Sequence, residues 1–74
     1  MKVLAFSTAR EIAGFAEVEI HVDPWDTPRT IVARVAPALA VGNLHAAVDY
    51  EHWECDRPVG EATELVIFPP VSGG

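Results

Sequence analysis

The chain has 74 residues, with eleven acidic against five basic side chains, a formal net charge of −6, half of its residues apolar and 22% charged. This composition indicates one small folded domain and excludes a disordered chain, while the negative charge disfavours binding to nucleic acid or to an anionic membrane surface. A domain of this size buries only about 60% of the surface that its unfolded chain exposes, so we expect it to act with a partner.

Two short strands are predicted at the start of the chain. Residues 2–6 are almost all apolar, and residues 17–22 alternate between polar and apolar side chains, which is the period of a half-buried strand. Between them, residues 8–13 are compatible with a short helical turn, and Gly14 stands where the chain must reverse.

One main helix is predicted to begin after Thr27. Threonine suits the N-cap of a helix, and Pro28 suits its first position. Three apolar residues recur at helical spacing and predict one buried stripe: Ile31, Val32 and Val35. Because Pro37 lacks a backbone donor and disfavours the helical state before it, we expect the helix to end or kink there.

The second half of the chain predicts further strands. Residues 44–50 favour a strand, Glu51 and His52 suit a turn, and a short extended piece is expected around Trp53. Residues 64–68 form the strongest strand, since four of the five are consecutive apolar residues, which is typical of a central strand.

This order of elements predicts an α+β fold, with a mixed sheet of four to five strands and one main helix on one face. The least alternating strands, residues 2–6 and 64–68, are expected side by side and parallel in the middle of the sheet. A single helix cannot cover both faces, so the other face would be left partly apolar, as at a partner site.

The most informative pattern stands at the end of the chain: Phe68, Pro69, Pro70, Val71, Ser72, Gly73 and Gly74. The two prolines stop the strand and favour stiff polyproline II geometry, and glycines without side chains can pass through a narrow channel. A carboxylate at Gly74 becomes reactive only if another enzyme adenylates it in a water-excluded site. We therefore expect a folded body over residues 1–68 and an extended, flexible tail over residues 69–74, the alternative being an inert terminus.

This final motif is similar to the C-terminal signature of the small subunit of molybdopterin synthase, a family of ubiquitin-like β-grasp sulfur carriers. Residues 9–12 with Gly14 resemble the N-terminal pattern of that family, and residues 44–49 resemble its middle strand. The resemblance covers the whole chain in order and length. The chain departs from it at Asp49, where asparagine is common, and at residues 60–64, where the family commonly has an Asp-Gly-Asp turn.

The resemblance implies a sulfur carrier that binds no cofactor tightly and has no activity alone; we expect it in the cytoplasm, because a single cysteine favours a reducing compartment. A ubiquitin-activating-type enzyme would use ATP to adenylate the carboxylate of Gly74, and a sulfur donor protein would convert it to a thiocarboxylate. The terminal sulfur would then attack cyclic pyranopterin monophosphate to build the molybdopterin dithiolene, so Gly74 is the expected catalytic residue. The expected partner is the large subunit of molybdopterin synthase, in a heterotetramer.

The resemblance also implies which residues bind the large subunit. Six residues would form the inserted part of the tail: Phe68, Pro69, Pro70, Val71, Ser72 and Gly73. Phe6 and Arg10 fall at positions that resemble the rest of the interface. The alternatives are core packing for the phenylalanines and a solvated surface charge for the arginine.

Other interpretations concern the remaining reactive side chains. Cys55 is the single cysteine, which favours a reducing compartment, and we expect a structural or surface thiol rather than a sulfur relay. His52 and Cys55 form half of a zinc motif without its second half, so no metal site is expected. A sulfur carrier for thiamine or cysteine, a ubiquitin-like modifier joined to lysines, and an interaction module with an inert tail remain alternative functions.

Overall fold

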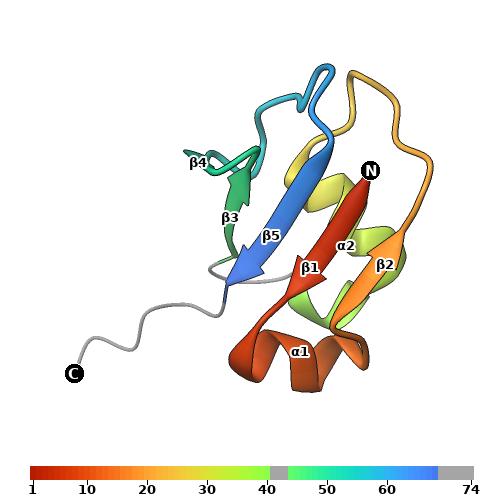
Figure 1. The fold of residues 1–74 in the computed structure, drawn as a ribbon, viewed down its shortest axis with the longest axis vertical. Helices are drawn as coiled ribbons and strands as arrows, with labels where there is room; N and C mark the ends of the chain where they lie inside the picture. The colour runs from red at the N-terminus through yellow and green to blue at the C-terminus, as the bar shows by residue number, and fades with distance from the viewer. Residues whose placement is uncertain (41–43, 69–74) are drawn as a thin grey trace.

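The computed structural model describes residues 1–40 and 44–68, and these form a five-stranded mixed sheet with two α-helices (Figure 1). The strands are β1 (Lys2–Ala5), β2 (Glu17–Glu19), β3 (His45–Val48), β4 (Glu51–Trp53) and β5 (Glu64–Phe68). The helices are α1 (Ser7–Ala13), α2 (Pro28–Val35) and the 3₁₀ helix η1 (Pro37–Leu39). In Figure 1, α2 lies behind the sheet and α1 at one end of it.

The strand order is β2-β1-β5-β3-β4, with β5 in the middle. β1 and β5 are parallel, in a register that pairs Lys2 with Glu64 and Ala5 with Ile67. β3 runs antiparallel to β5, and β2 and β4 form the two edges. The predicted α+β fold and the parallel central pair are confirmed.

The hydrophobic core lies between the sheet and α2. Its fully buried members include residues of β1, β5 and α2: Val3, Ala5, Leu65, Ile67, Ile31 and Val32. Alternation along β1 and β5 places every second side chain on this side. Within residues 1–40 and 44–68, no helix has the length and apolar character needed to cross a bilayer.

The start of α2 is fixed by its own sequence, as predicted. The side chain of Thr27 accepts a hydrogen bond from the backbone of Thr30, and Thr30 Oγ1 accepts one from the backbone of Thr27. Pro28 occupies the first turn, where a missing N–H costs nothing. The helix ends at Val35, and Pro37 begins η1, which confirms the predicted interruption.

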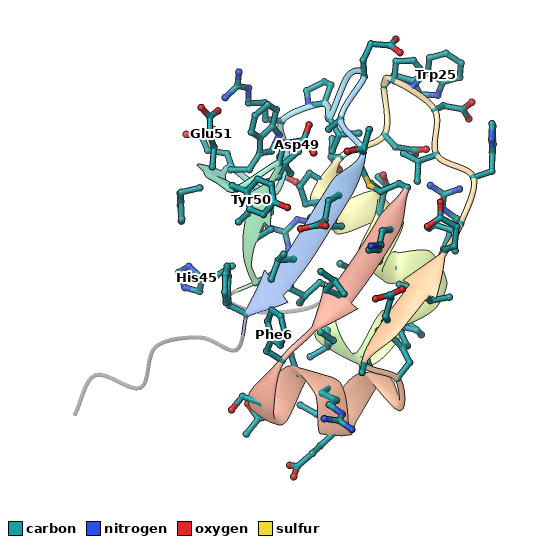
Figure 2. The ribbon with its side chains drawn as sticks, in the orientation of Figure 1. Phe6, Trp25, His45, Asp49, Tyr50 and Glu51 are labelled. Atoms are coloured by element: carbon teal, nitrogen blue, oxygen red, sulfur yellow. The ribbon has the colours of Figure 1, made fainter. Side chains whose placement is uncertain are left out.

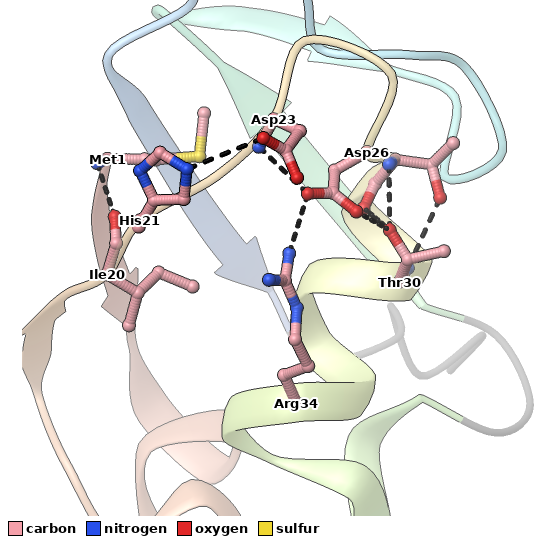
Figure 3. A network of polar contacts seen from close by, with 8 residues as sticks. Met1, Ile20, His21, Asp23, Asp26, Thr30 and Arg34 are labelled. Atoms are coloured by element: carbon pink, nitrogen blue, oxygen red, sulfur yellow. Dashed lines mark hydrogen bonds and ion pairs between the residues drawn. The ribbon is translucent and has the colours of Figure 1, made fainter.

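A polar network around Asp26 joins this helix to the preceding loop (Figure 3). Its carboxylate accepts hydrogen bonds from the backbone N–H of Asp23 at 2.9 Å, from Thr30 Oγ1 at 3.1 Å and from Arg34 Nη2 at 2.8 Å. The hydrogen bond from Asp23, followed by the contacts with Thr30 and Arg34, holds the pKa of Asp26 below its usual value, although partial burial opposes the shift. The ionised carboxylate therefore stabilises the folded loop.

Two predicted elements near the N-terminus differ in length from those observed. The helical turn is a full helix, α1, which ends where Gly14 adopts a φ of +83° and its N–H donates to the carbonyl of Arg10 at 2.9 Å. The second strand ends at Glu19 rather than at residue 22. It stops there because its partner β1 begins at Lys2, and beyond that point only Met1 remains to pair: Ile20 N–H donates to the carbonyl of Met1, and the N-terminal ammonium of Met1 donates to the carbonyl of Ile20.

The predicted turn between β3 and β4 is placed wrongly. We expected a strand as far as Tyr50 and a turn at Glu51, whereas Asp49 and Tyr50 form the two-residue turn, and Glu51 begins β4 opposite Val48. Both turn residues have positive φ, 47° and 69°. The prediction failed because positions 49 and 50 hold neither a glycine nor an Asn-Gly pair, which are the usual signals of a two-residue turn.

Candidate functional site

The face of the sheet that α2 leaves uncovered carries an apolar strip. Leu4 pairs with Val66 and Val66 pairs with Ala47, so these three side chains form one row across β1, β5 and β3. They alternate with Val3 and Leu65 and therefore point to the opposite side from the core; Val66, in the middle strand, is buried, while Leu4 and Ala47 are half-buried. We name this surface the open face and define it by Leu4, Phe6, Ala47, Val66 and Phe68.

Phe6 and Phe68 lie at the same end of the open face. The register of β1 and β5 pairs Ala5 with Ile67; Phe68 ends β5, and Phe6 follows the end of β1 as the N-cap of α1. Phe6 is 51% exposed and Phe68 is 39% exposed, so neither is a core residue of the isolated chain. Figure 2 shows Phe6 in front of the end of β5. Two exposed aromatic side chains at one end of a sheet are typical of a protein-binding surface.

Arg10 lies in α1, the helix that begins directly after Phe6. Its backbone N–H donates to the carbonyl of Phe6 at 3.3 Å, and its side chain is exposed. With Ser7, Thr8 and Glu11 it lines a shallow hollow on the surface. The structure therefore places Arg10 close to Phe6, with its charge accessible to a partner.

The predicted reactive tail lies outside the described residues. It comprises Pro69, Pro70, Val71, Ser72, Gly73 and Gly74, while Phe68 is the last residue described and the last of β5. Because β5 is the middle strand, the body ends at the centre of the sheet edge rather than at a corner. Phe68, at the same end of the open face as Phe6, is thus the base from which the predicted tail begins.

Charged residues border the open face along β2 and at the start of β1 and β5. Lys2 pairs with Glu19 on one side and with Glu64 on the other, and Glu17 pairs with Leu4. Acidic side chains thus outnumber basic ones at this border, in keeping with the net charge of −6. A partner that presents basic groups around an apolar centre would match this pattern.

Two histidines on this side of the sheet were not identified as a pair from the sequence. His45 pairs with Phe68 across β3 and β5, His52 pairs with Ala47 across β3 and β4, and the two imidazole rings lie 6.4 Å apart between centroids. Only the register brings them together, and sequence spacing alone does not reveal it. Among the described residues, no group of three or more histidine, cysteine or acidic side chains is arranged to hold a metal ion.

Cys55 occupies a structural position. Its thiol donates to the carbonyl of Leu44 at 2.8 Å, and its own carbonyl accepts a hydrogen bond from the N–H of Arg29 at 2.9 Å. Burial raises the pKa of this thiol, and the nearby Arg29 guanidinium only partly offsets the effect. A thiol kept protonated in this way is a poor nucleophile, which favours the structural role over a sulfur relay.

Comparison with solved structures identifies the class of fold. The chain superposes on SAMP1 from Haloferax volcanii with a TM-score of 0.72 and 24% identity, over 99% of this chain and 97% of the other. It superposes on a putative molybdopterin converting factor, subunit 1, from Pyrococcus furiosus with a TM-score of 0.71 and 20% identity, over 95% of each chain. These likenesses define the fold as a ubiquitin-like β-grasp.

Comparison of sequences identifies the family. No protein-family model matches the chain. The molybdopterin synthase sulfur carrier subunit of Escherichia coli (strain K12) is 36% identical over 80 aligned positions, which cover 100% of this chain and 99% of the other. The chain therefore belongs to the family of molybdopterin synthase sulfur carrier subunits.

Proposed function

We propose that this protein is a sulfur carrier that acts as the small subunit of a molybdopterin synthase. A ubiquitin-activating-type enzyme consumes ATP to join the Gly74 carboxylate to AMP, a sulfur donor displaces AMP, and Gly74 then carries a thiocarboxylate. The terminal sulfur attacks cyclic pyranopterin monophosphate, and two deliveries complete the dithiolene. The observation that carries this proposal is the 36% identity to a carrier of that name over the full length of both chains.

The fold supports this role because it can direct a tail. β5 is hydrogen-bonded on both sides, to β1 and to β3, and its middle residues are buried. A strand fixed in this way gives the residues that follow Phe68 a rigid origin. Six residues beyond Phe68, fully extended, reach at most about 20 Å, which suffices to enter the active site of a partner while the body stays outside.

The open face supports docking to the large subunit. Phe6 and Phe68 provide exposed apolar area at the origin of the tail, and Arg10 adds a charge from α1 that can pair with a carboxylate of the partner. Docking on this surface would bury the aromatic pair and orient the tail in one step. A heterotetramer with two large subunits at its centre is the expected assembly.

Intact mass spectrometry tests the carrier role. The purified chain is incubated with the adenylating enzyme, ATP and a sulfur source, and the expected product is heavier by the difference between a sulfur and an oxygen atom. Omission of ATP, or deletion of Gly74, abolishes this change. Circular dichroism of the deletion variant should match that of the wild type, because Gly74 lies beyond the last strand. An unchanged mass of the wild-type chain would refute the proposal.

A second assay separates this role from protein modification. The charged chain is mixed with the large subunit and cyclic pyranopterin monophosphate, and dithiolene formation is followed together with the appearance of conjugates on denaturing gels. Dithiolene formation without conjugates is expected. Ladders of lysine conjugates would instead favour a modifier, the alternative suggested by the fold shared with the small archaeal modifier protein 1 of Haloferax volcanii (TM-score 0.71, 22% identity, 95% of each chain).

A further inference from the structure

Tyr50 occupies a backbone conformation that its side chain does not favour. It is the second residue of the turn between β3 and β4, and its φ is +69°. Glycine and asparagine adopt this region readily, whereas a bulky aromatic residue there is an outlier that must be held in place by its surroundings. Such strain often marks a position that serves a function.

The surroundings that hold this turn are visible in the hydrogen bonds of its neighbour, Asp49. The N–H of Asp49 donates to the carbonyl of Glu64 at 3.0 Å, and Asp49 Oδ1 accepts from the N–H groups of Thr63 and Glu64 at 3.1 and 3.0 Å. These bonds tie the turn to the start of β5. Pairing of Val48 with Glu51 leaves exactly two residues for the turn, so Tyr50 cannot relax without loss of the register.

No packing of the Tyr50 side chain within the described residues offsets this strain, because the side chain is 87% exposed. A side chain with so little contact contributes almost no burial energy to the folded monomer. The turn would be at least as stable with asparagine or glycine in its place. A rigid turn that holds an exposed aromatic ring in a fixed direction is the arrangement of an interface anchor, for which tyrosine is among the favoured residues.

We propose that Tyr50 is an anchor of the interface with the large subunit, an inference that rests on the proposed function. Asp49 precedes and Glu51 follows Tyr50 in the sequence; the Asp49 carboxylate holds the turn to β5, whereas Glu51 is exposed, so the matching site on the partner is an apolar slot bordered by arginine or lysine. A guanidinium there can stack on the ring and pair with the carboxylate of Glu51. The reaction at the tail is not needed for this contact, which sets affinity and choice of partner.

The position of Tyr50 is continuous with the open face. In Figure 2, where α2 lies behind the sheet, Tyr50 and Phe6 are both drawn in front of it. Tyr50 lies near the start of β5, through Asp49 and Glu64, while Phe68 is at its end. A strand of this length spans roughly 16 Å, and an ordinary interface of about 800 Å² per partner is wide enough to cover both ends.

The test compares the affinity for the purified large subunit with thermal stability. Tyr50→Asn removes the ring and suits a positive φ, so we expect binding at least about tenfold weaker and a Tm equal to or above that of the wild type. Tyr50→Phe keeps the ring and should bind within about threefold of the wild type. Trp25→Ala is the matched control, since Trp25 is also exposed, at 72%, but lies in the loop before α2.

Each result decides one question. Wild-type affinity for Tyr50→Asn would overturn the anchor while leaving the carrier role intact, and so would a loss of affinity equally large in Trp25→Ala. If the wild-type chain itself fails to bind the large subunit, the proposed function fails and not merely the role of Tyr50. Weak binding of Tyr50→Asn, with normal binding of Tyr50→Phe and an undiminished Tm, establishes the anchor.

Discussion

The loop around Asp26 and the open face differ in where their side chains find partners. The polar groups around Asp26 are hydrogen-bonded within the chain, whereas the aromatic rings of the open face remain exposed. Around Asp26, a carboxylate that is only 15% exposed accepts bonds from the loop, from Thr30 and from Arg34, so the region satisfies its own groups. On the open face, Phe6 and Phe68 remain partly in water. At its border, Tyr50 is exposed and held at a positive φ.

This contrast separates residues that stabilise the fold from residues that await a partner. The Asp26 region gains its free energy within the chain, because each bond has both ends in the described residues. The exposed apolar area of the open face and the backbone strain at Tyr50 are offset only when the surface of a partner covers them. Changes in the first region should therefore affect unfolding, and changes in the second should affect binding.

The largest effect on unfolding is expected from Ile67, which neighbours Phe68 in β5 but points to the core. Ile67→Ala leaves a cavity beneath the central strand and should lower the free energy of unfolding by about 2–5 kcal/mol. Since a domain of this size has only about 3–5 kcal/mol in total, much of the variant would be unfolded. Urea denaturation measures this. If Ile67→Ala lowered the free energy of unfolding by less than Phe68→Ala does, the assignment of Ile67 to the core and of Phe68 to the open face would be wrong.

Removal of the Asp26 carboxylate is expected to have the next largest effect. Asp26→Asn loses the charge-assisted bond to Arg34 and weakens the bond to the backbone of Asp23, at a cost of about 1.5–3 kcal/mol. Asp56→Asn is the control, because its bond to Arg29 is exposed and an exposed ion pair contributes little. Affinity for the large subunit should stay unchanged. Equal destabilisation by the two variants would show that the Asp26 network contributes no more to stability than an exposed ion pair.

The pH dependence of unfolding sharpens the same point. Because the pKa of Asp26 is lowered in the folded state from its usual 3.8, its stabilisation is fully present above that pH and is lost as the pH falls below it, through the folded pKa. The difference in free energy of unfolding between the wild type and Asp26→Asn should shrink as the pH falls from 5 to about 2. Urea titrations at several pH values measure it, and a constant difference would contradict the assignment.

On the open face, Phe6→Ala should act mainly on binding. Loss of the ring removes a large part of the exposed apolar area at this end of the open face, and we expect affinity for the large subunit to fall about tenfold, or 1.4 kcal/mol. The free energy of unfolding should change by less than that, since the ring is 51% exposed. Isothermal titration calorimetry measures the affinity for the large subunit, and urea denaturation measures the free energy of unfolding. A larger effect on unfolding than on binding would place Phe6 functionally in the core.

Much of this division was predictable from the sequence. Four consecutive apolar residues identified β5, and the Thr27-Pro28 pair identified the start of α2, because both signals are local. The partly apolar second face was predicted because one main helix can cover only one of the two faces of a sheet. The tail motif led to the family, which the identity of 36% over the full length then established.

What the sequence did not reveal depends on contacts between distant segments. The turn at Asp49 and Tyr50 is selected by bonds to Thr63 and Glu64, fourteen and fifteen residues from Asp49, and not by any glycine. The early end of β2 depends on where β1 begins. The pairing of His45 with Phe68 likewise follows from register. Each is a tertiary constraint that local patterns do not record.

The smallest effect is expected at the cap of α2, where the two regions can be tested for independence. Thr27→Ala removes the acceptor for the N–H of Thr30 and should lower the free energy of unfolding by about 1 kcal/mol. Thr27→Asn keeps an acceptor and should restore most of that loss. Neither change alters the open face, so the affinity for the large subunit should equal that of the wild type. If Thr27→Ala weakens binding as well, and Thr27→Asn restores it, then α2 positions the sheet for its partner and the two regions are coupled rather than separate.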